Sequence, residues 1–329
     1  MITIVLIAVA AGSASALMFA SIISGALVSL LLLYLAPLPL MVAGLGWRPL
    51  AATIGGILAA IGLGAIFGLP YCIAFVITVA LPAWWLGHLV LLGRLTGNEA
   101  ASGNGAAPVA PDLEWYPIGR ILLWIAGFAT LTTVAVLLTL GGDGATITAT
   151  LKRGLLRILS SRSGTPPTGQ VEQVIDAVVV LAPTAAAIIF MMTLTLNLWL
   201  AAKITATSGR LQRPWPDLKS TELPPMTLAA LSAAIAFCFV GGLLAMLAQT
   251  VSAALMMAYA FVGFAVLHTL TLSVKSRGFL LICTYVIVVM FSWPVLAMVV
   301  LGLADAIFGL RQRYLQSRPP PIPHPDVTP

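Results

Sequence analysis

The chain has 329 residues, of which 60% are hydrophobic and only 8% are charged, and its mean hydropathy is +1.07. These values lie far outside the composition of soluble globular proteins and indicate a membrane protein. The net charge of +6 comes from Lys and Arg in the polar segments. In a membrane protein such residues indicate the orientation of the chain in the bilayer before they indicate a nucleic-acid partner. No basic face interleaved with aromatic residues occurs, so no nucleic-acid partner is expected.

Apolar segments of membrane-spanning length recur along the whole chain. A spanning helix needs about 20 mostly apolar residues. The first segment lacks a basic n-region, so we expect it to remain as a helix rather than to be cleaved as a signal peptide. The sequence predicts an all-α, polytopic transmembrane bundle of eight to nine spans, at residues 3–19, 21–46, 50–68, 70–92, 118–141, 179–202, 226–247, 251–272 and 279–303.

These spans predict a single integral membrane domain over residues 1–303. A C-terminal helix end and a Pro-rich tail follow over residues 304–329. Polar loops are predicted between the spans, at residues 94–117, 142–178 and 203–225.

Residues 145–162, within the second of these loops, have the pattern of an amphipathic helix. One helical face is apolar, and basic residues occupy much of the rest. The apolar set is Leu151, Leu155, Ile158 and Leu159, and the basic set is Lys152, Arg153 and Arg157. Two interpretations stay open: the helix lies on the lipid headgroups, or it docks on a protein partner.

None of the ten acidic residues falls inside a predicted span. A carboxylate in hydrocarbon is costly and usually marks a proton relay, an ion site or a catalytic acid. No P-loop, HExxH, GxSxG or paired-carboxylate motif occurs. The three cysteines, Cys72, Cys238 and Cys283, lack the spacing of metal ligands. We therefore expect a protein that is not an enzyme and has neither a metal site nor a cofactor.

Small residues recur every four positions in the first and third predicted spans. They are Ala8, Gly12 and Ala16 in the first span, and Gly56, Ala60 and Gly64 in the third. Such stripes let helix backbones approach closely. They are explained either by packing inside the bundle or by a docking face for another membrane subunit.

Breaks and polar residues inside the spans are the candidates for a pocket. Pro37 and Pro39 interrupt the second span, and a helix break at membrane depth must face protein or a cavity. Asn197 is either an interhelical hydrogen-bonding residue or a ligand contact. His268 has no acidic residue or second His nearby in sequence, which favours a packing role over metal binding. Asn197 and His268 are the ligand-binding residues that we predict.

Two further polar segments allow only local predictions. The loop SGRLQRPWPDL (208–218) contains a Pro-Trp-Pro turn and either covers a helix end or contacts another subunit. Asp305 and Arg311 lie six positions apart near the end of the last helix, too far for an i,i+4 ion pair. We expect each of these two charges to cap another element.

Several motifs taken together resemble a known family. They are YLAPLPLMVAGLGWRPL before a glycine-rich helix, NLWLAAKITATSGRLQRPWPDL, AYAFVGFAVLHTL and GLADAIFGLR. This pattern resembles the YybS-like family of uncharacterised bacterial membrane proteins. That family is distantly similar to the S-components of energy-coupling-factor transporters, which bind a vitamin or a metal and dock on a T-component driven by ATPases.

The resemblance implies a multi-pass protein of the bacterial inner membrane with an S-component-like core. The stripe of Ala8, Gly12 and Ala16 matches in kind the face by which S-components meet their T-component, whereas no vitamin-binding residue can be matched. The implied function is non-catalytic substrate binding for an energy-coupled small-molecule importer. Its partners would be the lipid bilayer, the T-component and ATPase subunits, and an unknown small molecule. The alternative is a membrane scaffold or assembly factor that binds other proteins.

Overall fold

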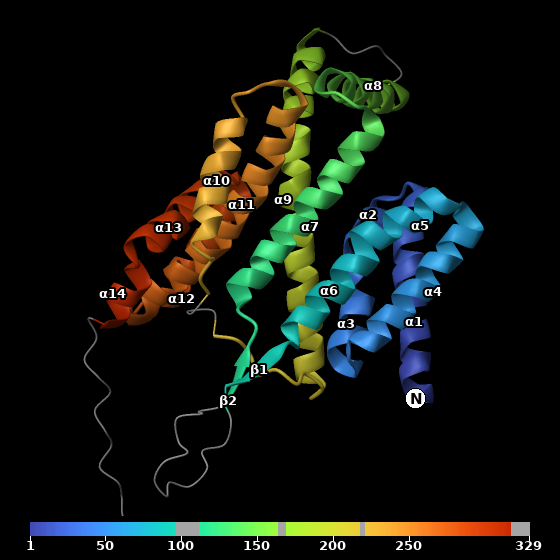
Figure 1. Cartoon of the computed structure of the whole chain (residues 1–329). Helices are drawn as coiled ribbons and strands as arrows, with labels where there is room; N and C mark the ends of the chain where they lie inside the picture. The colour runs from blue at the N-terminus through green and yellow to red at the C-terminus, as the bar shows by residue number, and fades with distance from the viewer. Residues whose placement is uncertain (97–111, 164–168, 218–220, 317–329) are drawn as a thin grey trace, which may run out of the picture. The chain divides into compact units, whose positions relative to one another are not determined.

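The computed structural model describes residues 1–96, 112–163, 169–217 and 221–316. These residues are almost entirely helical (Figure 1), which confirms the predicted all-α membrane bundle. In the described ranges, seven helical segments are long and apolar enough to cross a membrane, or eight if the bent pair α13–α14 forms one span. The predicted Pro-rich tail and most of the first predicted loop lie outside the described residues.

The chain divides into two compact units, which we describe separately. The first unit contains Met1–Pro216 and Met226–Leu255, and the second contains Asp217–Pro225 and Met256–Pro329. Helix α11 (Gly242–Leu270) contributes to both units, because the boundary falls inside it.

The first unit is built mainly from membrane-length helical segments with short breaks. In chain order its elements are α1 (Ile2–Ala20), η1 (Ser21–Ser24), α2 (Leu27–Leu35), α3 (Pro37–Trp47), α4 (Pro49–Phe67), α5 (Leu69–Phe75), η2 (Val76–Ala80), α6 (Leu81–Val90), β1 (Gly93–Thr96), β2 (Asp112–Trp115), α7 (Ile118–Leu140), α8 (Gly144–Ser163), α9 (Gly169–Thr207), α10 (Met226–Phe237) and the first half of α11. The two strands pair antiparallel, with Gly93 opposite Trp115. The core is apolar and includes the fully buried side chains of Leu40, Phe75, Leu86, Ile125 and Met191.

Proline and glycine set most of the breaks in this unit. The predicted interruption of the second span is present, because α2 ends at Leu35 and α3 begins at Pro37. Helix α4 begins at Pro49 and ends before Gly68, whose φ of 90° suits a residue without a Cβ. The π-helical turn η2 directly precedes α6, where Pro82 removes one backbone donor.

The predicted amphipathic helix is α8, and it lies across the ends of α7 and α9 (Figure 1). Asp143 caps its first turn, since its Oδ1 accepts the Thr146 backbone N–H at 2.9 Å and its Oδ2 accepts the Thr146 hydroxyl at 2.6 Å. Helix α9 extends at both ends beyond the predicted span 179–202.

The predicted division between spans 226–247 and 251–272 is wrong. Helix α10 already ends at Phe237, and α11 then continues unbroken for 29 residues. The turn between them contains Gly241 and Gly242, both with positive φ, at 89° and 61°. Two adjacent glycines allow a left-handed turn that other residues disfavour, so the break lies there and not near residue 249.

The second unit contains the end of α11, η5 (Thr271–Ser273), α12 (Arg277–Phe291), α13 (Val295–Phe308) and α14 (Leu310–Gln316). The predicted single span 279–303 is wrong, because Ser292, at φ 59°, separates α12 from α13. Helix α12 has no buried residue, as expected of an apolar helix that faces lipid. Helices α11 and α13 touch through glycines: a Cβ on Gly302 would overlap the carbonyl oxygen of Tyr259.

Candidate functional site

A cluster of neutral polar groups surrounds the break between α2 and α3. The Asn197 side-chain amide, from α9, donates to the Tyr34 carbonyl at 2.8 Å and to the Thr193 carbonyl at 2.7 Å. The Ser15 hydroxyl, from α1, donates to the Ala36 carbonyl. Side chains from two neighbouring helices therefore bind the backbone carbonyls at the break. We call these five residues the break cluster.

The break between α2 and α3 explains why such donors gather here. Pro37 and Pro39 have no N–H and leave the carbonyls of Leu33 and Leu35, four positions earlier, without their helical donors, so regular helical bonding is interrupted around Ala36. In a membrane, neighbouring helices and hydroxyl side chains must supply the missing hydrogen bonds. Through its bond to Tyr34, Asn197 thus makes the interhelical contact that the sequence left as one of two alternatives. Ser15 was missed, although a hydroxyl at mid-span near a double-proline break was the signal that could have found it.

One atom of the break cluster keeps an unused hydrogen-bonding capacity. The Asn197 side chain is 1% exposed, and among the described residues no donor reaches its Oδ1. A buried acceptor without a donor costs about 1–3 kcal/mol. The break cluster can therefore receive a hydrogen bond from a group other than the described residues.

His268, the second predicted ligand residue, lies in the other unit. Its Nε2 is 2.8 Å from the Tyr285 hydroxyl, and Tyr285 stacks on Phe264 with ring centroids 5.4 Å apart. The Arg277 guanidinium donates to the His268 carbonyl at 3.4 Å. These contacts tie α11 to α12, in keeping with the packing role that the sequence favours.

The predicted docking stripes lie largely against other helices of the first unit. Ala8 and Gly12 are buried in the contact between α1 and α4, where a Cβ on Gly12 would overlap the Gly55 carbonyl oxygen. Ala16 is half-buried. In α4, Gly56 and Ala60 are buried, and Gly64 lies beside Cys72. Internal packing accounts for these residues, and docking of another subunit stays a prediction.

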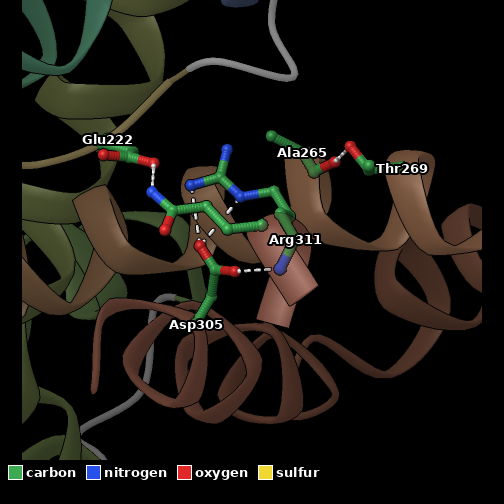
Figure 2. Close-up of polar contacts among 6 residues, drawn as sticks. Glu222, Ala265, Thr269, Asp305 and Arg311 are labelled. Carbon is green, nitrogen blue, oxygen red and sulfur yellow. Dashed lines mark hydrogen bonds and ion pairs between the residues drawn. The ribbon is translucent and has the colours of Figure 1, made fainter. Parts of the chain in front are cut away.

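The prediction that Asp305 and Arg311 cap separate elements is wrong, because they form a buried ion pair (Figure 2). Asp305 Oδ2 accepts from Arg311 Nε at 2.8 Å and lies 2.7 Å from Nη2, while Oδ1 accepts the Arg311 backbone N–H at 2.9 Å. Gly309, at φ 61°, ends α13, and α14 leaves at an angle of 66°. The i,i+4 rule holds only for a continuous helix, and this bend brings residues six apart into contact.

Figure 2 also shows two other hydrogen bonds in the second unit. The Gln312 side chain donates to Glu222 at 3.3 Å, and on α11 the Thr269 hydroxyl donates to the Ala265 carbonyl at 2.8 Å (Figure 2). The side chains of Asp305 and Arg311 are only 6% and 3% exposed. An ionised pair in an apolar helix is a default candidate for a functional site. Here the carboxylate already accepts three contacts from Arg311, so the geometry favours a role in holding the bend.

The loop after α9 covers a helix end, which was one of the two interpretations of segment 208–218. Arg213 is buried, and its guanidinium donates to the Val90 carbonyl, at the end of α6, at 3.3 Å. It also lies 5.8 Å from the Trp115 ring, while Arg210 lies 4.5 Å from the Trp47 ring. Burial lowers the pKa of Arg213. Leu218, the last residue of this segment, lies outside the described part of the chain.

The fold and composition define a multi-pass α-helical membrane protein. Residues 159–306, somewhat less than half of the chain, match a family model described as "Predicted membrane protein (DUF2232)". The match contains Asn197, His268 and Asp305, and it supports a membrane family without a described function. Comparisons with curated proteins and with solved structures found no match. Within the described residues, no three His, Cys, Asp or Glu side chains gather as they would around a metal ion.

Proposed function

We propose that this chain is a non-catalytic membrane subunit that holds a small molecule at the break cluster and delivers it to an energy-coupled importer. The observation that carries the proposal is the buried Asn197 Oδ1, which accepts no hydrogen bond from the described residues. A ligand N–H or O–H directed at this atom would remove the cost of the unsatisfied acceptor.

The chemistry of the break cluster restricts the ligand. All five of its residues are neutral, so a charged group of the ligand would find no counter-charge among them. Transfer of an unpaired charge into such surroundings is far more costly than transfer of a hydroxyl or an amide. We therefore propose a neutral, mostly apolar molecule with one donor group, in line with the apolar lining and few polar groups typical of ligand pockets.

The importer part of the proposal is supported by the resemblance of the sequence motifs to a family distantly similar to S-components. It implies a T-component and ATPase subunits as partners, because the chain has no nucleotide-binding motif of its own. Helix packing accounts for Ala8 and Gly12 in the α1–α4 contact, so the T-component would dock on other outward-facing residues.

Native mass spectrometry of the protein, gently extracted from its own membrane, tests this function. We expect an added small-molecule mass on the wild-type chain, its loss in Asn197→Leu, and co-ejected T-type and ATPase subunits. Ser15→Ala is the matched control, because it removes the other side-chain donor to the break and leaves Asn197 Oδ1 intact. Loss of the added mass from both variants would indicate that Asn197 serves packing and does not bind the ligand. If the chain carries only unrelated proteins, the alternative function of a membrane scaffold or assembly factor would be favoured.

A further inference from the structure

The apolar face of α8 continues past the bundle on which its first half packs. Ile147 is completely buried, whereas Ile158 and Leu159, farther along the same face, are 57% and 39% exposed. Leu151 and Leu155, between them, are half-buried. One continuous apolar stripe is therefore covered by protein at its start and exposed at its end.

The level at which α8 lies is set by the two helices that it crosses. Helix α7 ends at Leu140 and α8 begins at Gly144, so only a short turn separates α8 from the end of a membrane span. On α9, Asp176 binds Lys152 Nζ at 2.6 Å. These two connections hold α8 where the apolar spans end, which is the boundary between hydrocarbon and headgroups.

The charge of α8 complements an anionic surface. Gly144–Ser163 contains no acidic residue, and Arg153 and Arg157 are exposed on the side away from Ile158. Lys152 is paired with Asp176, and the exposed Arg153 and Arg157 add two positive charges. The Arg153 guanidinium also donates to the Ala149 carbonyl at 3.3 Å and to the Thr150 hydroxyl at 3.2 Å. An apolar stripe at the acyl boundary flanked by arginines is the arrangement by which interfacial helices bind anionic lipids.

We propose that the second half of α8 is a binding surface for anionic phospholipid headgroups. Ile158 and Leu159 insert at the acyl boundary, while Arg153 and Arg157 extend to lipid phosphates. This surface is independent of the break cluster, and it holds whether or not the chain carries a small molecule.

A fluorescent reporter on the full-length protein tests this surface. In a background in which Cys72, Cys238 and Cys283 are replaced by Ala, an environment-sensitive dye is attached through Ile158→Cys or, as a water-facing control, through Ser160→Cys. The detergent-solubilised protein is titrated with phosphatidylglycerol or with neutral phosphatidylcholine. We expect a saturable change at position 158 with phosphatidylglycerol, and little change at position 160 or with phosphatidylcholine.

The arginines are tested by matched losses of charge. Arg153→Gln with Arg157→Gln should weaken phosphatidylglycerol binding about fivefold for each arginine lost. Arg94→Gln with Arg120→Gln removes the same charge from exposed residues elsewhere and should leave binding unchanged. The pair Arg153→Lys and Arg157→Lys keeps the charge and should bind, which separates loss of charge from misfolding.

Three results would each overturn the proposal. Equal responses to both lipids would mean an apolar contact without headgroup recognition. Wild-type affinity in the double glutamine variant would remove the arginines from the surface. A dye at position 158 that responds to neither lipid, but is covered in the native membrane complex, would assign the face to a protein.

Discussion

Each unit contains a buried polar cluster described above, and the two clusters differ in charge and in how fully they are hydrogen-bonded. At the break cluster, neutral side chains satisfy backbone carbonyls, and Asn197 Oδ1 is left without a donor among the described residues. In the second unit, both carboxylate oxygens of Asp305 are bound by Arg311. A neutral acceptor can stay unsatisfied at a cost of about 1–3 kcal/mol, but an unpaired buried charge costs far more. Because of this difference, we propose ligand binding at the neutral cluster and a structural role for the ion pair.

The largest expected effect comes from breaking the ion pair. Asp305→Ala removes the carboxylate that accepts three contacts from the buried Arg311, so we expect a loss of about 3–5 kcal/mol of unfolding free energy. Asp305→Leu combined with Arg311→Met removes both charges and should recover most of that loss. Thermal unfolding of the purified protein in detergent measures both variants. If the single and double variants lose equal stability, the pair does not hold the bend by its charges.

A smaller effect is expected where helices touch through glycine. In the second unit, Gly302→Ala places a methyl group against the Tyr259 carbonyl, and in the first, Gly12→Ala places one against the Gly55 carbonyl. Forced displacement of packed backbones costs about 1–3 kcal/mol. Gly127→Ala in α7 is the control, because nothing lies within 4 Å of the added Cβ. An unchanged unfolding temperature for Gly12→Ala would argue against internal packing of the small residues of α1 and would favour docking of another subunit on them.

Much of the architecture could be predicted because membrane helices follow from local composition. Apolar length marked the early spans, the pair Pro37 and Pro39 marked the α2–α3 break, and the pattern of residues 145–162 marked α8 almost to its ends. The break between α10 and α11 was misplaced, because Gly241 and Gly242 lie inside a run that is apolar on both sides. Hydropathy does not respond to backbone conformation, so a glycine turn within an apolar run has no signal on that scale.

The polar contacts of the two clusters depend on tertiary structure and were not predictable in detail. Asn197 binds the carbonyl of Tyr34, which lies 163 positions away, and no local pattern identifies that partner. Asp305 and Arg311 meet only because Gly309 bends the chain between them. The prediction from their spacing assumed a continuous straight helix between these two residues. Asn197 could be named as a candidate because a polar amide inside a span is rare. The sequence shows that burial of this amide is costly, but it does not show which groups bind the amide.

The next effect separates ligand binding from packing at the break cluster. A ligand that binds only the folded chain raises its apparent stability, so washing away small molecules should lower the unfolding temperature of the wild type. Ser15→Ala should respond in the same way, starting from a lower value. Asn197→Leu should lose about 1 kcal/mol for its interhelical bond to Tyr34 and show no further change on washing. A wild-type chain that is indifferent to washing would contradict a bound ligand at Oδ1.

The smallest expected effect is on α8, which is held by the Asp143 cap and by the contact of Lys152 with Asp176. Asp143 and Lys152 titrate at opposite ends of the pH scale. The hydroxyl and backbone N–H of Thr146 hold the pKa of Asp143 below its usual value, and the hydrogen bond to Asp176 raises the pKa of Lys152. The Asp143 cap therefore stabilises α8 above the carboxyl pKa of the unfolded chain and is lost as the pH falls through the folded value. The Lys152 contact is complete below the unfolded lysine pKa and is lost as the pH rises through the folded one.

The loss of the Asp143 cap at low pH is measured by hydrogen exchange of the first-turn amides of α8, corrected for the intrinsic dependence of exchange on pH. We expect protection at Thr146 and Ile147 to fall on acidification in the wild type, because a protonated Asp143 accepts more weakly. Asp143→Asn keeps a capping oxygen that does not titrate, so its protection should stay constant over the same range. Parallel loss of protection in both proteins would show that acid acts elsewhere. This effect is confined to one helix end, because Asp143 is exposed and water can replace its hydrogen-bond partners. Loss of the Asp305 pair has a larger effect, because water does not reach a buried charge.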